Sequence, residues 1–211
     1  DAITAKLVHY NAETGAPEND IADKIESSDN QNFTVTLKKG YKFHDGTEVK
    51  AKNFVDAWNY AAYGPNAQSS GYFMEPIEGF GDTQCTGDGD DPCAGAGKAK
   101  ADKLTGLAVK DDYTFTIKTT EKVSNMAVRL GYSAFAPLPD TFAADPKAYG
   151  EKPIGAGPFK FDSWTKNTEI KLSKFADYSG KFGGKLDGIT FKIYQDEDAA
   201  YNDVIANQLD V

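Results

Sequence analysis

The stretch LKKGYKFHDGTEVKA, residues 37–51, joins a strand pattern to a helix pattern. Residues 33–37 before it alternate apolar and polar side chains, which predicts a half-buried β-strand. The Phe43-His44-Asp45-Gly46 sequence within it is typical of a hairpin turn. Residues 52–62 after it place an apolar stripe of Phe54, Ala57, Trp58 and Ala61 at helical spacing, which predicts a helix that buries Phe54 and Trp58.

Further strands and one further helix follow from the same periodicities. Residues 113–117, 169–173 and 189–193 alternate as residues 33–37 do, and each predicts another half-buried strand. A helix over residues 197–207 is predicted, with Asp196 as its N-cap. Its apolar residues, which we expect to face inward, are Ala200, Tyr201, Val204 and Ile205. The chain therefore has a mixed α/β fold, with strands more numerous than helices.

Composition excludes two classes of function. The 211 residues include 23 Lys and Arg against 32 Asp and Glu, so the net charge is −9. A nucleic-acid surface needs clustered positive charge, and so does docking on anionic lipid. No apolar run approaches the roughly 18 residues that a membrane-spanning helix requires.

Residues 82–103 form a polar insert with no hydrophobic period, and we expect a long surface loop there. Its cysteines, Cys85 and Cys93, predict a local disulfide, because zinc would need four ligands and no histidine is near. Two free thiols are the alternative. The acidic segment 88–91 raises a calcium site as a second hypothesis, but the spacing of a calcium-binding EF-hand loop is missing. A solvated acidic turn is the simpler interpretation.

Catalytic signals are scarce. His9 and His44 are the only histidines, and no G-x-S-x-G turn presents a nucleophile. His44 and Asp45 could act as an acid–base pair, but a hairpin turn explains them more simply. Residues 155–158, Gly-Ala-Gly-Pro, precede a strand pattern, so no helix N-terminus is expected there for a phosphate. We therefore predict no enzyme activity, cofactor or metal; a secreted hydrolase remains the rival, and a structural or adhesive module is disfavoured because no repeat is present.

Several segments together resemble the family 5 extracellular solute-binding proteins, which include the oligopeptide-, dipeptide- and nickel-binding proteins of ABC importers. Residues 37–51 resemble the family's L-R-x-G followed by F-H-D-G-T-P-V-T-A. Residues 107–117 are similar to V-D-D-Y-T-F-x-V, residues 153–161 to P-V-G-T-G-P-Y-K-F, and residues 206–211 to S-G-E-V-D. Three positions depart from this pattern. Lys50 to Asn53 lack the usual capping box, Ala156 replaces Thr, and Lys6 replaces the Gly of an E-G-L-V element.

The resemblance implies one lobe of a type II periplasmic binding protein. It places a mixed α/β subdomain at residues 1–19 and 136–211 and a smaller β-rich one at residues 20–135. The chain starts at Asp1 without an initiator Met and stops in an apolar stretch, so we interpret it as a piece of a longer protein. A second lobe would follow Val211, and a lipid anchor would lie on an N-terminus absent from this chain.

The implied function is capture of a small peptide outside the cell by a clamshell that closes on it and then meets an ABC permease. A nickel chelate or a sugar is the alternative ligand. The expected protein is a monomer, either a cell-surface lipoprotein or periplasmic. The expected ligand contacts are at Ala5, Lys6, Leu7, Tyr72, Phe73, Gly155 and Ala156, although Tyr72 and Phe73 could simply pack under the insert.

Overall fold

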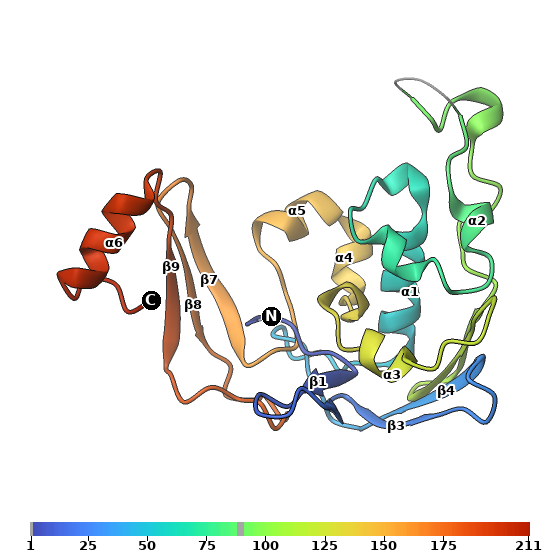
Figure 1. The fold of residues 1–211 in the computed structure, drawn as a ribbon, viewed down its shortest axis with the longest axis horizontal. Coiled ribbons are helices and arrows are strands. Elements are labelled where there is room, and N and C mark those ends of the chain that lie inside the picture. Colours follow the sequence, from blue (N-terminus) through green and yellow to red (C-terminus); the bar gives the residue numbers. More distant parts are fainter. Residues whose placement is uncertain (1, 88–90) are drawn as a thin grey trace.

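The computed structural model describes residues 2–87 and 91–211 (Figure 1). The strands are β1 Val8–Tyr10, β2 Pro17–Asn19, β3 Ala22–Glu26, β4 Asn32–Leu37, β5 Leu107–Asp111, β6 Thr114–Lys118, β7 Phe159–Thr165, β8 Glu169–Lys174 and β9 Gly188–Lys192. The α-helices are α1 Ala51–Ala62, α2 Phe80–Thr83, α3 Met126–Arg129, α4 Asp140–Ala144, α5 Pro146–Glu151 and α6 Glu197–Ile205. Short 3-10 helices are η1 Gly64–Asn66, η2 Gly71–Met74, η3 Gly95–Gly97 and η4 Ser133–Phe135. The strands at 33–37, 113–117, 169–173 and 189–193 and the helix at 52–62 are confirmed to within a residue or two.

Within the described residues the strands form three antiparallel sheets. Their orders are β1-β2, β3-β4-β6-β5 and β7-β8-β9. In the four-stranded sheet Val35 pairs with Phe115 and Phe33 with Ile117, and all four side chains are buried on one face. Helix α1 stands over this sheet, while the three-stranded sheet and α6 lie at the other end of the molecule (Figure 1).

Helix α1 begins with half of a capping box. Asn53, at the third helical position, accepts the backbone amide of Lys50 through Oδ1 at 2.8 Å. The expectation that Lys50 to Asn53 had lost the box is therefore wrong for this half, because an amide side chain substitutes for the usual Glu or Gln. The other half is absent because a lysine side chain cannot accept a hydrogen bond.

An aromatic cluster joins α1 to the sheet. The ring of Trp58 lies 5.5 Å from that of Phe115 and 5.1 Å from that of Phe135, both edge to face, and Phe54 stacks on Phe115 at 5.7 Å. The Trp58 indole donates from Nε1 to the Phe135 carbonyl at 3.1 Å. The predicted burial of Phe54 and Trp58 is confirmed, since both side chains have no exposed surface.

Helix α6 is present, but its packing differs from the prediction. Asp196 caps it as expected by accepting the Asp198 amide at 2.8 Å. Tyr201 is 65% exposed and Ile205 68% exposed, so the expectation that Ala200, Tyr201, Val204 and Ile205 face inward is wrong. Periodicity identifies the apolar side of a helix but not whether an element packs against it, and no described element covers this side.

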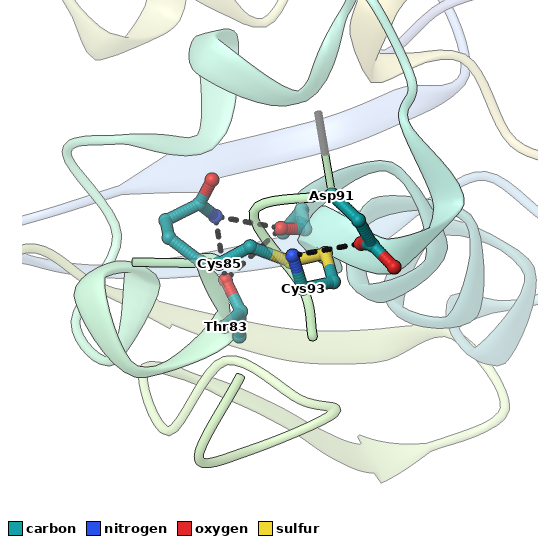
Figure 2. The surroundings of a disulfide bond; sticks show 6 residues. Thr83, Cys85, Asp91 and Cys93 are labelled. Carbon is teal, nitrogen blue, oxygen red and sulfur yellow. Dashed lines mark hydrogen bonds between the residues drawn. A yellow bond between two sulfur atoms is a disulfide. The ribbon is translucent and has the colours of Figure 1, made fainter. Parts of the chain in front are cut away.

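The insert is fastened to the end of α1. Cys85 and Cys93 form a disulfide with a Cα–Cα distance of 4.8 Å (Figure 2). Thr83 Oγ1 and Gln84 Nε2 both donate to the Ala62 carbonyl, at 3.0 and 2.8 Å. Residues 88–90, to which most of the calcium hypothesis refers, lie outside the described residues.

One hydrophobic core draws on both predicted subdomains. The four-stranded sheet lies within residues 20–135 and the three-stranded sheet within residues 136–211, but Ala5, Leu7 and Ala156 belong to the same buried cluster as Phe115. The boundaries at 19/20 and 135/136 therefore stay predictions. Of the helices in residues 2–87 and 91–211, none has the length and apolar character needed to cross a bilayer.

Replacing Trp58 by Ala should lower the free energy of unfolding by about 3–5 kcal/mol, because it removes the centre of the aromatic cluster and leaves a cavity. Tyr201→Ala on the exposed side of α6 is the control and should change it by about 0.5 kcal/mol or less. Urea unfolding followed by circular dichroism measures both. Equal losses in the two variants would contradict the assigned core.

Candidate ligand-binding site

A hollow of about 540 Å³ lies where the N-terminal segment meets the chain around α3 and η4. Lys6 and Tyr10 come from the N-terminal side, Ser70 and Phe73 from the segment around η2, and Gly131 to Ala134 from the turn after α3. Residues more than 120 positions apart in sequence thus share one surface. The hollow combines aromatic rings with hydroxyl groups and a single lysine, a mixture suited to an organic ligand with polar groups.

Aromatic side chains form the walls. The ring of Phe73 meets that of Tyr132 edge to face at 5.3 Å, and Tyr10 meets Tyr132 at 6.4 Å. The Tyr10 hydroxyl donates to the Val128 carbonyl at 2.5 Å, which fixes the ring. A Cβ at position 131 would lie 2.6 Å from the Tyr10 ring and hydroxyl, so a larger residue there would displace this ring. Burial raises the pKa of Tyr10, and Tyr132 adds to the rise, so the phenol stays neutral at physiological pH.

A buried charged group lies beneath the hollow. Lys6 is 9% exposed; burial lowers the pKa of its ammonium group, and the negative charge of Asp20 opposes this. Burial likewise raises the pKa of Asp20, whose Oδ1 accepts the Tyr41 hydroxyl at 2.7 Å. The Lys6 carbonyl accepts the Ile21 amide at 3.0 Å, so the lysine backbone is held on the start of the sheet.

The structure brings together only some of the predicted contact residues. Lys6 and Phe73 line the hollow. Ala5 and Leu7 belong to the core, with 2% and 0% of their surface exposed. Tyr72 is 65% exposed and its ring contacts that of Phe73 at a tilt, with the ring centres 4.3 Å apart, but it lines the neighbouring cavity.

Gly155 and Ala156 lie away from the hollow, beside the N-terminal segment. A Cβ on Gly155 would overlap the Ile3 carbonyl oxygen, and one on Gly157 would lie 2.6 Å from the Thr4 nitrogen. The Gly157 amide donates to the Ile3 carbonyl at 3.0 Å. These glycines therefore allow the turn to pass directly against the backbone of residues 3 and 4.

His44 fastens this glycine turn. Its amide donates to the Gly155 carbonyl at 2.8 Å, and the Gly155 amide donates back to His44 Nδ1 at 3.2 Å. Since Nδ1 accepts, Nε2 carries the proton and donates to the Gly157 carbonyl at 3.1 Å. Both ring nitrogens are therefore committed to backbone groups, which removes the basis for a His44–Asp45 acid–base pair.

Tyr10 and Tyr132 are site residues that the sequence did not indicate. Tyr10 is in a three-residue strand and Tyr132 in a turn, and neither position shows a period. In residues 2–87 and 91–211 no group of three or more His, Cys, Asp or Glu side chains is arranged to hold a metal ion.

Comparison with known proteins gives one consistent family. The profile described as bacterial extracellular solute-binding proteins, family 5 Middle, matches residues 16–211. The oligopeptide-binding protein OppA of Bacillus subtilis is 26% identical over 209 residues, covering 97% of this chain and 36% of the relative. The dipeptide-binding protein DppE of the same organism is 27% identical over 201 residues, covering 92% of this chain and 34% of the relative. The chain thus spans about a third of the length of these curated relatives.

Solved structures share the fold. Haemophilus influenzae OppA in complex with RPPGFSPFR superposes with a TM-score of 0.85 at 23% identity, covering 99% of this chain and 39% of that one. The murein tripeptide binding protein MppA of Escherichia coli gives 0.83 at 22% identity, with coverage of 99% and 39%. The mixed α/β fold expected from the sequence is therefore that of these binding proteins.

Acidification should weaken the fold through His44. Burial lowers the pKa of its imidazole, with Lys160 acting in the same direction and the Gly157 hydrogen bond and Asp45 opposing. An unfolded histidine titrates near pH 6.5, so below that pH the unfolded state binds the proton that the folded state resists. The free energy of unfolding should therefore fall as the pH drops below about 6.5, and His44→Gln should lack this part of the fall.

Urea unfolding of the wild type and His44→Gln between pH 5 and 8 measures the difference. His9→Gln is the control, since it keeps the His44 hydrogen bonds and should retain the acid-side loss. If the wild type and His44→Gln show parallel pH profiles, the neutral His44 bridge does not exist in the assigned form.

Proposed function

Because the chain belongs to family 5 of the bacterial extracellular solute-binding proteins, we propose that it is part of a binding protein that captures peptides for an ABC importer. The family comprises solute-binding proteins and not enzymes, and its members act outside the cytoplasm. The observation that carries the proposal is the aromatic and hydroxyl-lined hollow between the N-terminal segment and the residues before η4, in a chain matched over residues 16–211.

Peptide is the favoured ligand on two grounds. The curated relatives carry the names oligopeptide-binding protein, dipeptide-binding protein and glutathione-binding protein, and the ligands in these names are peptides, whereas the solved structure of the binding protein AgaA holds agropinic acid. The hollow offers tyrosine and serine hydroxyls, which can hydrogen-bond amide groups of any sequence, beside rings that pack on side chains. A sugar could stack on the same rings, and a nickel chelate is the second alternative; both are outcomes of the test below.

The hollow is open on the side that faces away from this chain. Small-ligand sites enclose roughly 70–90% of the ligand surface, whereas this one is open on one side. We assign the opposite wall to a second lobe in the part of the relatives' length that this chain does not span. The ligand closes the lobes because it makes more contacts in the closed form; equal affinity for both forms would shift nothing.

The remaining assignments follow from this mechanism. The closed form would be recognised by the membrane permease, and a monomer is sufficient because each protein carries its own clamshell. A periplasmic location and a lipid anchor on the cell surface both fit the extracellular family. The proposed division of residues 1–19 and 136–211 from 20–135 places the hollow between the two subdomains.

Calorimetry on the complete protein tests the ligand. Di- to oligopeptides should give saturable heat, and sugars and nickel chelates none. Tyr132→Ala should weaken peptide binding about tenfold or more by removing one wall, while Phe191→Ala, an aromatic residue of similar exposure (48% against 41%) on β9, should not. Heat from a sugar or chelate alone would overturn the peptide assignment.

The 211-residue chain alone should bind the same peptides more than a hundredfold more weakly. A ligand enclosed on one side only loses contacts worth about 3 kcal/mol or more of binding free energy. Each 1.4 kcal/mol lost weakens the affinity tenfold. Binding of equal strength by the chain alone would show that the site needs no second wall.

A further inference from the structure

A second cavity, of about 400 Å³, adjoins the hollow on the other side of η2. The same short segment separates the two. Ser70 and Phe73 line the hollow, whereas Gly71 and Tyr72 line the second cavity. The rings of Tyr72 and Phe73 contact each other at a tilt of 31° with their centres 4.3 Å apart, so one ring faces each space. This ring pair therefore lies at the boundary between the hollow and the second cavity.

The partition is fixed in position by helix α1. A Cβ on Gly71 would lie 2.5 Å from the Ala61 carbonyl oxygen, so only glycine lets the segment rest directly on the end of the helix. Tyr72 is therefore presented at 65% exposure by a backbone that cannot move toward α1. Exposed aromatic rings held on a rigid support are favourable contact surfaces for a ligand.

The disulfide-bonded insert supplies another wall. Gln84 lines the cavity and is tied to the last carbonyl of α1, that of Ala62, at 2.8 Å. Cys85 packs so closely on Gly64 that a Cβ at 64 would lie 2.9 Å from its amide nitrogen. Figure 2 shows Thr83 and Cys85 at this junction, next to Cys93. The insert thus has a structural consequence at the cavity, although it lies outside the hydrophobic core.

The cavity presents hydrogen-bond acceptors. The Gln84 amide group donates to the Ala62 carbonyl and to Thr83 Oγ1, and the Gln68 amide group donates to the Asn66 carbonyl at 2.8 Å. These bonds turn the side-chain nitrogens to the backbone and leave the carbonyl oxygens available. Glu75 adds a carboxylate, and no lysine or arginine lines the cavity.

Glu75 has no ion-pair partner among the described residues, although it also lines a further cavity together with Lys122 and Arg129. Across residues 2–87 and 91–211, no cation lies within 4.0 Å of its carboxylate. Its neighbour Glu78, three residues on, pairs with Lys118 at 2.8 Å. A carboxylate, amide oxygens and an aromatic ring together form the surroundings that a guanidinium or ammonium group prefers.

We propose that this cavity is a side-chain subsite selecting a basic residue, Arg or Lys, in the bound peptide. The proposal rests on peptide capture as the function of the hollow. The peptide main chain occupies the hollow, and one side chain crosses Tyr72 to place its cation between Glu75 and the amide oxygens of Gln68 and Gln84. The subsite adds a preference at one position to recognition that is otherwise independent of sequence.

Calorimetry on the complete protein with pentaalanine and with its five single-arginine and five single-glutamate variants tests the subsite. At one position arginine should raise the affinity about three- to tenfold over alanine, and glutamate should lower it. Glu75→Gln should abolish this preference without changing pentaalanine binding. Glu78→Gln, the matched control, should keep it. Raising the salt from about 0.05 to 0.5 M should reduce it, because a partly exposed ion pair is screened.

The outcomes separate the two proposals. If pentaalanine binds but no position prefers arginine, or if the preference survives in Glu75→Gln, the subsite is overturned and peptide capture stands. If none of the peptides binds the complete protein, peptide capture fails and the subsite fails with it. A preference that Glu78→Gln removes as strongly as Glu75→Gln would locate the effect in overall charge and also overturn the subsite.

Discussion

The imidazole of His44 connects the three parts of the chain on which the rest of the structure depends. It belongs to the hairpin between β4 and α1, and it bonds to both Gly155 and Gly157 before β7. The same glycines pass against Ile3 and Thr4, so the N-terminal segment is enclosed between hairpin and turn. One neutral side chain in a 15-residue stretch thereby fixes where the chain enters the core and where the second sheet begins. Lys6 lies three residues beyond that contact, at the hollow.

Packing in the aromatic core positions the residues that line the hollow. Trp58 holds the Phe135 carbonyl through its indole and packs on the Phe135 ring, while Phe73 packs on the other side of that ring at 6.3 Å. Tyr132 is only three residues before Phe135 in the chain, so its position depends on the position of Phe135. The walls of the hollow are thus the outer edge of the aromatic core, which gives them rigidity before any ligand arrives.

Features that depend on local periodicity and turn chemistry could be predicted from the sequence. Strand alternation at 33–37 and the helical stripe around Trp58 report burial on one face, and the structure follows both. Features that depend on a contact with a residue far away in the chain could not be predicted in this way. Whether Tyr201 on α6 is covered, and whether Tyr10 meets Tyr132, are settled by residues far away in the chain. The family resemblance suggested ligand contact at Ala5 and Leu7, whose side chains have almost no exposed surface in this chain, so ligand contact there stays a prediction.

The two cavities divide recognition into a general and a selective part. Phenols and hydroxyls in the hollow can satisfy any main chain, because every peptide bond offers the same donors and acceptors. The second cavity differs from the hollow because it holds the carboxylate of Glu75 and no lysine or arginine lines it. A positively charged side chain is therefore the group that gains most from entering it. Tyr72 is exposed between the two spaces, on a segment that rests on α1. The boundary between the hollow and the second cavity is therefore set by the fold before any ligand binds.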